Sequence, residues 1–273
     1  FAGESARFVV KSRLDLIREN YRDQEKVLQF LDEMQEDMVE NVGLFMPQQQ
    51  EANGNEAPTD TLEFSLNRYR ANVLEDRSGI EGAPVVFEPN PTYQNVFGRI
   101  EKRAHMGTVT TDFTMVQAGS LLQANGGFLI MDVESVLQNP YVWEALKRAL
   151  QNKSIQIEDI AEESGFGTVS LRPEAIPLKV KVILLGSYDA FEVLQNYDPR
   201  FNKTFKVRAD FDYETERSPA TIQLYARYIA RVCKEEGLRP FAHGAVAAVV
   251  EYGEKIIARK NKLSLRFGPI VSI

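Results

Sequence analysis

The sequence predicts an α/β protein in which a mainly parallel sheet carries helices on both faces and is followed by a helical lid. Along the middle of the chain, short apolar runs alternate with amphipathic helical patterns, which is typical of this class. The stretch GGFLIMD, residues 126–132, is a continuous apolar run, as expected for a strand buried on both faces. From Ser218 onward the pattern is helical only, which predicts a separate lid.

The composition is that of a globular protein. The chain has 273 residues, 44% of them hydrophobic, which suffices for a sizeable core in one to three domains. No apolar run approaches the ~20 residues of a membrane helix. The net charge of −7 argues against broad nucleic-acid binding. Cys233 is the only cysteine, which excludes an intrachain disulfide and a cysteine-based zinc site and fits the reducing cytoplasm that we expect.

The first expected element is a long helix over residues 8–46. Apolar residues recur there at alternating steps of three and four from Leu14 to Phe45, and Gln24 and Gln35 occupy two slots of the same series. This coiled-coil-like pattern predicts an amphipathic helix that packs on its own domain or on a second helix. The polar slots disfavour the alternative, a self-assembling coiled coil. Residues 47–61 are polar and predict a flexible loop.

The remaining elements follow from the apolar periodicity and the turn residues. Strands are expected at residues 68–76, 84–88, 127–131, 179–185 and 205–211, with a shorter pair at 154–158 and 167–171. Helices are expected at residues 92–104, 118–124 and 141–151, with a loop over 105–116, and Ser218-Pro219 is expected to start the lid helices. These elements predict three domains: a helical insertion with its loop (1–67), an α/β core (68–217) and the lid (218–273).

Two predicted core strands end in residues that could bind a ligand. Asp132 ends one strand, and ligands of parallel sheets bind beyond the carboxyl ends of the strands. A carboxylate there can hold a magnesium ion beside nucleotide phosphates. Ser187 follows the next strand and could contact a γ-phosphate or the attacking water. The structural alternatives are an ordinary strand end at Asp132 and a helix cap at Ser187.

The lid offers one further candidate. Arg266 stands at the start of a predicted helix, after a polar loop. An arginine in such a place can reach over a bound triphosphate. The alternative is a solvated surface arginine.

Several blocks of sequence occur in one order across residues 68–273 and include NPTYQNVFGRIE (90–101), MGTVTTDFT (106–114), AGSLLQANGGFLIMD (118–132), WEALKRAL (143–150), PLKVKVILLG (177–186) and EEGLRPF (235–241). Together, in this order, these blocks resemble the AAA+ module of Lon-like proteases, in particular the Lon-related ATP-dependent proteases of bacteria and their archaeal membrane-bound relatives. The resemblance implies an AAA+-like parallel sheet with flanking helices, a helical insertion before it and a C-terminal lid.

The resemblance also implies roles for individual residues. Asp132 is similar to the Walker B aspartate, which holds Mg²⁺ in that family. Ser187 is similar to the sensor-1 residue, and Arg266 to the sensor-2 arginine of the lid. The substrate-gripping pore loop of the family falls at residues 105–113, and its candidate contact residues are His105, Met106 and Phe113.

The sequence departs from the family's pattern in three ways. Val133 replaces the Walker B glutamate, and the catalytic candidate Glu134 comes one residue later, where the alternation of a strand would point it the opposite way. The arginine finger is expected near Arg200 or Lys203. The phosphate-binding motif GxxxxGK[ST] does not occur. The resemblance therefore implies a longer parent, with the P-loop before the first residue of this chain and a protease domain with a Ser-Lys dyad after the last.

Two hypotheses of function follow. In the first, the chain is the AAA+ module of a Lon-like serine protease and is inactive alone; its parent uses ATP and Mg²⁺, forms a ring expected to be a hexamer, and delivers unfolded proteins to the peptidase. In the second, the module is a degenerate scaffold for ring assembly and substrate docking that does not hydrolyse ATP. Asp132, Ser187 and Arg266 favour the first hypothesis, whereas Val133 and the missing finger arginine favour the second. A third reading, a coiled-coil interaction protein with an unrelated α/β domain, would require the order of the blocks to be chance.

Overall fold

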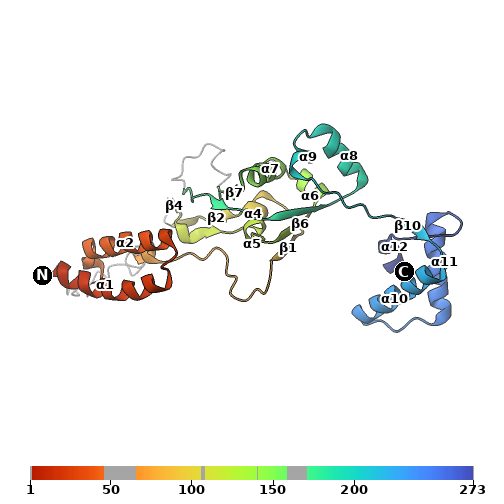
Figure 1. Ribbon diagram of the computed structural model, residues 1–273, viewed down its shortest axis with the longest axis horizontal. Helices are drawn as coiled ribbons and strands as arrows, with labels where there is room; N and C mark the ends of the chain where they lie inside the picture. Colours follow the sequence, from red (N-terminus) through yellow and green to blue (C-terminus); the bar gives the residue numbers. More distant parts are fainter. Residues whose placement is uncertain (1, 46–65, 106–107, 140, 159–170, 273) are drawn as a thin grey trace. The chain divides into compact units, whose positions relative to one another are not determined.

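The computed structural model describes residues 2–45, 66–105, 108–139, 141–158 and 171–272 (Figure 1). The chain forms two compact units, Phe1–Thr204 and Phe205–Ile273, and each is described by itself. Among the helices of these residues, none combines the length and the apolar character that crossing a bilayer requires.

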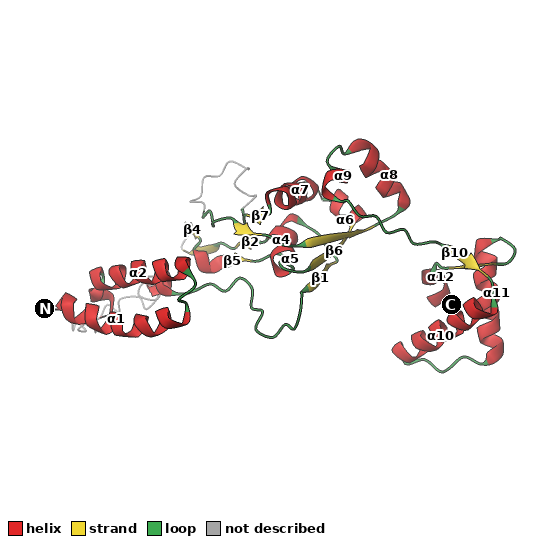
Figure 2. Cartoon of the chain, viewed as in Figure 1, coloured by secondary structure: helices red, strands yellow, loops and turns green. Residues whose placement is uncertain are grey.

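The first unit contains a parallel sheet of three strands in the order β1–β6–β9 (Figure 2). The strands are β1 (Val85–Glu88), β6 (Phe128–Asp132) and β9 (Lys181–Leu185). Their registers pair Glu88 with Met131 and Asp132 with Leu185, so the carboxyl ends of all three strands lie at one edge of the sheet. The strands predicted at 84–88, 127–131 and 179–185 are confirmed, and so is the α/β fold class.

Four helices accompany the sheet: α4 (Tyr93–Phe97), α5 (Ser120–Gln123), α6 (Val133–Gln138) and α7 (Val142–Asn152). Leu129 and Met131 of the central strand are fully buried. The glycine pair before β6 allows a close approach to β1, because a Cβ at Gly127 would lie 2.0 Å from the carbonyl oxygen of Pro84. The helices predicted at 118–124 and 141–151 are confirmed, whereas α6 is an element that the apolar pattern does not predict.

The helix predicted at residues 92–104 is wrong beyond Phe97. Gly98 has φ of 97°, a left-handed conformation that ends α4. The chain then forms β2 (Arg99–Ile100), which pairs with β5 (Val116–Gln117). Between them lie β3 (Arg103–His105), β4 (Thr108–Thr110) and the 3₁₀ helix η3 (Phe113–Met115), so paired strands replace the end of the predicted helix and the beginning of the predicted loop.

The long helix predicted at residues 8–46 is two helices, α1 (Ala2–Asn20) and α2 (Glu25–Glu40), followed by the 3₁₀ helix η1 (Val42–Phe45). A turn over residues 21–24 separates them, and the two helices pack on each other with Leu14 and Leu31 buried. The structure explains why the two polar residues, Gln24 and Gln35, interrupt the apolar series. Gln24 is the N-cap of α2, and Gln35 accepts a hydrogen bond of 3.0 Å from Arg18 of α1. The expectation of packing on a second helix is met within the same chain.

The strand predicted at residues 68–76 is wrong. The segment begins with the 3₁₀ helix η2 (Asn67–Tyr69) and continues without regular structure. The Asn72 amide donates to the carbonyl oxygens of Phe113 and Val116, which ties this segment to the loop around η3 through a side chain and not through a ladder. Tyr69 donates a 2.6 Å hydrogen bond to Asp37 of α2. Burial and that carboxylate raise the pKa of Tyr69 to about 12. The loop predicted at residues 47–61 lies outside the described residues.

The end of the first unit and the beginning of the second each differ from prediction in one place. The strand β7 (Ser154–Ile155) pairs with β8 (Ile176–Pro177), and residues 167–170 of the predicted partner lie outside the described part of the chain. The helices α8 (Tyr188–Tyr197) and α9 (Phe201–Thr204) follow β9. The core strand predicted at residues 205–211 is irregular chain, and its apolar side chains are open to solvent: Val207 is 91% and Phe211 93% exposed.

The second unit is a small helical body with a two-stranded antiparallel sheet. It comprises β10 (Glu214–Glu216), α10 (Pro219–Glu235), α11 (His243–Ile257), β11 (Lys262–Ser264) and α12 (Phe267–Val271). Its core contains Tyr225, Ile229, Val249 and Leu263. Ser218 starts α10 as predicted, in a capping box with Thr221. The expectation of an all-helical segment is wrong at β11, whose partner β10 precedes Ser218.

Candidate functional site

Asp132 ends β6 and is also the N-cap of α6. Its Oδ1 accepts hydrogen bonds from the backbone N–H and the hydroxyl of Ser135, both at 2.8 Å. These bonds, the backbone one first, hold the pKa of Asp132 below its usual value, so the carboxylate is ionised at neutral pH. The helix begins here because the side chain satisfies a free N–H group of the first turn. An ionised carboxylate at the end of a central parallel strand is therefore in place.

Glu134 reaches across the sheet edge to Ser187. Its Oε1 accepts from the Ser187 backbone N–H at 2.9 Å and from the Ser187 hydroxyl at 2.7 Å. The same hydroxyl oxygen accepts from the backbone N–H of Ala190 at 3.2 Å, so Ser187 is also the N-cap of α8. Ser187 therefore caps a helix, which was the structural alternative, and it also lies at the edge of the sheet. These bonds join the carboxyl ends of β6 and β9.

The side chains of Val133 and Glu134 point in different directions, but helical geometry sets these directions and strand alternation does not. Because α6 begins at Val133, the two residues follow helical and not strand geometry. Val133 is buried, and a Cβ on Gly186 would lie 2.2 Å from its Cγ1, so Val133 packs directly against the start of the turn after β9. Glu134 is left at the edge, with Oε1 on Ser187. Its Oε2 is buried and has no hydrogen-bond partner among the described residues.

The two arginine-finger candidates have different environments. Arg200 donates to Glu144 of α7 at 2.7 Å, and its backbone N–H donates to Asp198 at 2.9 Å. Lys203 lies on α9, is exposed and has no ion pair among the described residues. The structure therefore fixes Arg200 within its own unit and leaves Lys203 accessible.

A buried charge network lies beneath Arg200, and the sequence analysis missed it. Lys147 is 2% exposed and forms ion pairs with Asp198 at 2.5 Å and with Glu144 at 2.7 Å. Trp143 donates its indole N–H to Asp198 at 2.7 Å. Burial opposes ionisation of Asp198, but the hydrogen bonds from Lys147, from the Arg200 backbone and from Trp143 outweigh it and lower the pKa of Asp198. The available signal was a lysine on the apolar face of an amphipathic helix, which is rarely buried without a partner.

The pore-loop candidates are only partly described. His105 ends β3, one strand of the β3–β4 hairpin, and Met106 lies outside the described residues. Phe113 begins η3 three residues after that hairpin and is half-buried. The structure does not bring Phe113 into the hairpin.

Arg266 belongs to the second unit. It is the N-cap of α12, is exposed, and places its guanidinium 5.4 Å from the centre of the Tyr213 ring. Its backbone N–H donates to the Ser264 hydroxyl. Its helix-start position is as expected from the sequence.

Two family matches give the class of protein. Residues 240–273 match the family described as archaeal LonB, AAA+ ATPase LID domain, and residues 81–212 match the family described as LonB-like, AAA domain. The chain is therefore an AAA+ module. More particularly, it is a Lon-related AAA+ module.

The curated relatives support the same assignment. The archaeal Lon protease of Halobacterium salinarum is 27% identical over 164 residues, covering 59% of this chain and 22% of the relative. That of Thermoplasma volcanium is 26% identical over 167 residues, covering 59% of this chain and 24% of the relative. The chain thus spans less than a quarter of the length of these relatives.

Among solved structures, NtrX from Brucella abortus in complex with ADP is 16% identical, with a TM-score of 0.40, covering 60% of this chain and 34% of that one. A score at this level carries no argument about function.

Proposed function

We propose that the chain is the ATPase core and lid of a Lon-like ATP-dependent protease subunit. The observation that carries the proposal is the convergence of Asp132, Glu134 and Ser187 at the carboxyl edge of β6 and β9. Ligands of open parallel sheets bind at such an edge. An ionised aspartate and a serine hydroxyl on neighbouring strands are suited to a magnesium-bound phosphate group.

The residues present fit one part of a Mg²⁺-ATP site. Asp132 supplies a carboxylate of hard oxygen atoms, and only its Oδ1 is used by the helix cap. When bound, Mg²⁺ would neutralise charge on the phosphates. The role of Asp132 is to hold that ion, that of Ser187 is to contact the terminal phosphate, and that of Arg266 in the lid is to pair with phosphate oxygens. The sequence contains no backbone cradle for the phosphates, because GxxxxGK[ST] does not occur.

The sheet has an open edge at β9, which supports our proposal that the P-loop belongs to another part of a longer parent protein. Within the described residues β9 pairs only with β6, so its other edge is open. Ile183 and Leu185 of β9 point to one face of the sheet and are 41% and 49% exposed, which suits a further layer over that face, because parallel sheets are normally covered on both faces. In our proposal this chain provides a helical insertion (1–67), a partial core (68–217) and a lid (218–273), and the Ser-Lys peptidase follows.

The proposed parent works as a ring, which we expect to be a hexamer in the cytoplasm. Its partners are copies of itself and unfolded or damaged proteins. The segment with His105, Met106 and Phe113 would contact the threaded client, and Lys203 or Arg200 would act on the nucleotide of the neighbouring subunit. The ion pair of Arg200 with Glu144 and the exposure of Lys203 favour Lys203.

A second candidate function is a scaffold that assembles the ring without hydrolysing ATP. The hydrogen bonds between Glu134 and Ser187 favour this scaffold function. A general base must reach the water from which it takes a proton, but Oε1 of Glu134 is held by Ser187 and Oε2 is buried. Val133, which stands in the usual place of the base, has no titratable group.

ATP turnover by the full-length parent tests the proposal, with and without an unfolded substrate. The variant Asp132→Asn is preferable to alanine, because asparagine retains the helix cap and removes only the charge. Glu192→Ala, an exposed carboxylate on α8, is the matched control. Substrate-stimulated turnover that Asp132→Asn lowers at least a hundredfold, and Glu192→Ala leaves unchanged, would support the motor. Cleavage of substrate without any ATP turnover would support the scaffold.

A further inference from the structure

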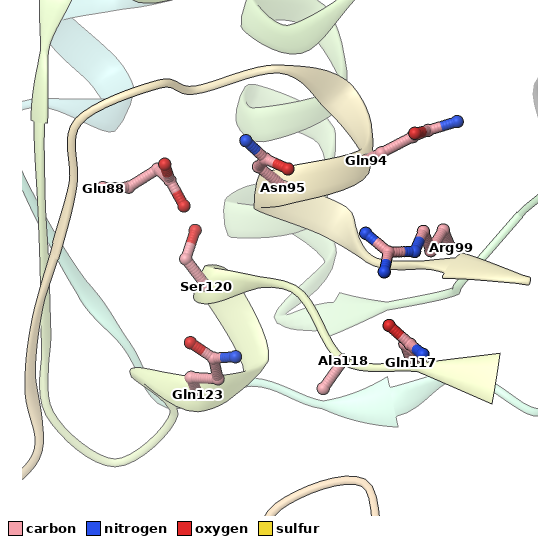
Figure 3. Close-up of a pocket in the computed structure, with 8 residues that line it drawn as sticks. All are labelled: Glu88, Gln94, Asn95, Arg99, Gln117, Ala118, Ser120 and Gln123. Atoms are coloured by element: carbon pink, nitrogen blue, oxygen red, sulfur yellow. The ribbon is translucent and has the colours of Figure 1, made fainter.

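A polar cavity of about 270 Å³ lies in the first unit, beside the carboxyl end of β1 (Figure 3). It shares no residue with the edge formed by Asp132, Glu134 and Ser187. Its walls come from β1, α4, α5 and the β2–β5 pair, and they contribute the side chains of Glu88, Gln94, Arg99, Gln117, Ser120 and Gln123. Neither the family matches nor the proposed function assigns a role to this cavity.

The walls of the cavity are held by a close contact between two backbone segments. A Cβ on Gly119 would lie 2.4 Å from both the Gly98 nitrogen and the Val96 carbonyl oxygen, so only glycine fits there. Val96 and Leu121, beside these glycines, are fully buried. The backbone segments that carry the cavity walls are therefore closely packed against each other.

One buried group in the wall has no partner. Ser120 is 3% exposed, and its hydroxyl makes no hydrogen bond within the described residues. In Figure 3 its oxygen is directed toward the carboxylate of Glu88. Buried hydroxyl groups are almost always hydrogen-bonded, so an orphan one beside a cavity calls for a ligand.

The amide groups of the wall are also available. The side chains of Gln94, Gln117 and Gln123 make no hydrogen bond in the part of the chain that the structure describes. The Asn95 amide is different, since it donates to the Asn90 carbonyl oxygen at 2.9 Å. The amides of Gln117 and Gln123 and the serine hydroxyl thus offer hydrogen-bond acceptors, together with donors, at the cavity, whereas the Gln94 amide points away from Glu88 and Ser120 in Figure 3.

The charged groups of the cavity favour a cation over an anion as the ligand. Arg99 is paired with Glu101 at 3.0 Å, which offsets its charge. Glu88 accepts a backbone N–H from Asn90 but has no ion pair among the described residues. The cavity therefore carries one uncompensated negative charge, which disfavours phosphate and other anions. It has no aromatic wall on which a nucleobase could stack.

We propose that this cavity binds the guanidinium or ammonium group of an arginine or lysine side chain from another polypeptide. Glu88 supplies the opposite charge, and the Ser120 hydroxyl and the glutamine carbonyl oxygens accept the remaining N–H groups. The cation comes either from a protein client or from a second copy of this chain. The inference does not depend on ATP binding or hydrolysis, so its failure would leave the proposed ATPase function intact.

The test is a titration of the whole 273-residue chain, isotope-labelled, with N-acetyl-arginine methylamide, followed by NMR. The neutral isostere N-acetyl-citrulline methylamide is the matched probe. We expect the arginine probe to shift the side-chain amide signals of Gln117 and Gln123, and the citrulline probe to bind at least tenfold more weakly. Glu88→Gln should remove that preference, whereas Glu81→Gln, an exposed carboxylate outside the cavity, should keep it.

Ser120→Ala separates binding from folding. Because the hydroxyl has no partner in the free protein, the variant should fold with unchanged or higher stability. Its affinity for the arginine probe should nevertheless fall several-fold, because it lacks the hydroxyl that the probe would contact. Sedimentation of wild type and Glu88→Gln then identifies the source of the cation: self-association that only the variant loses indicates a second copy, and unchanged sedimentation indicates a client. Equal binding of the two probes, or arginine binding that Glu88→Gln does not weaken, would overturn the proposal.

Discussion

The buried pair of Lys147 and Asp198 allows a quantitative test of how the region around Arg200 is stabilised. The perturbation is Lys147→Met, which keeps the aliphatic length of the side chain and removes the charge. Lys147 is 2% and the Asp198 side chain 11% exposed, so the pair is nearly shielded from water. Removing one partner of such a pair leaves an uncompensated charge and costs about 3–5 kcal/mol. The Glu144 contact adds little, because Glu144 is 60% exposed.

The lower end of that range applies here, since Asp198 keeps hydrogen bonds from Trp143 and from the Arg200 backbone. We therefore expect a loss of about 3 kcal/mol in the free energy of unfolding, which is a shift of about 1 M in the urea midpoint if the m-value is about 3 kcal/mol/M. Trp143 is the only tryptophan in the chain and contacts Asp198, so its fluorescence reports this site directly. The control is Arg148→Met on the exposed face of the same helix, which should change stability by less than about 0.5 kcal/mol.

The same pair predicts the pH dependence of stability. Asp198 has a lowered pKa in the folded chain, so it contributes stability that is present above its unfolded pKa of about 3.9 and is lost as pH falls through the lower folded value. In Lys147→Met the main cause of the lowering is gone and burial raises the folded pKa of Asp198, so this acid-induced loss should shrink and the variant should approach wild-type stability at low pH. If Lys147→Met were as neutral as Arg148→Met, with the same acid limb as wild type, the reasoning that this pair stabilises the unit would be refuted.

Three further predictions concern separate parts of the chain. Gly119→Ala should destabilise the first unit by more than about 2 kcal/mol, because the new Cβ would meet backbone atoms of Gly98 and Val96 that cannot move away; circular dichroism during heating would detect it, and a neutral result would mean that the close contact does not exist. Ser218→Ala should cost about 1 kcal/mol through loss of the capping box, whereas Ser218→Asp should retain most of the stability. The isolated chain should bind ATP poorly in calorimetry, since it has no phosphate cradle, and tight binding would contradict our placing of the P-loop outside it.

The central strands were predictable because burial on both faces demands an uninterrupted apolar run. β6 and β9 satisfy this rule, and their polar termini then had to meet at one edge of the sheet. The rule failed for residues 205–211, where an apolar pattern has no neighbouring strand within the described residues and stays irregular. A strand needs a partner as well as a suitable composition, and composition alone does not show the partner.

The candidate site was predictable in its residues but not in its connections. Asp132 and Ser187 follow from their places after strands. The contact between Glu134 and Ser187 depends on α6 beginning immediately after Asp132, which changes the direction of the two following side chains. The helix predicted over 92–104 failed for a similar local reason, because one left-handed glycine, Gly98, ended it early. Such single-residue events decide side-chain direction, yet they barely alter an apolar periodicity.

The bond between Glu134 and Ser187 has a consequence for how this family can diverge. A change at position 187 removes both hydrogen bonds to Glu134 and the cap of α8, and a change at position 134 removes the acceptor for the N–H and hydroxyl of Ser187. Gly186 is tied in the same way to the side chain at position 133, since any larger residue at 186 would need a smaller one than valine there. Among homologous sequences, positions 134 and 187 should therefore vary as a pair, and positions 133 and 186 should exchange volume. The evolution of this sheet edge would then appear in an alignment as two pairs of positions that change together.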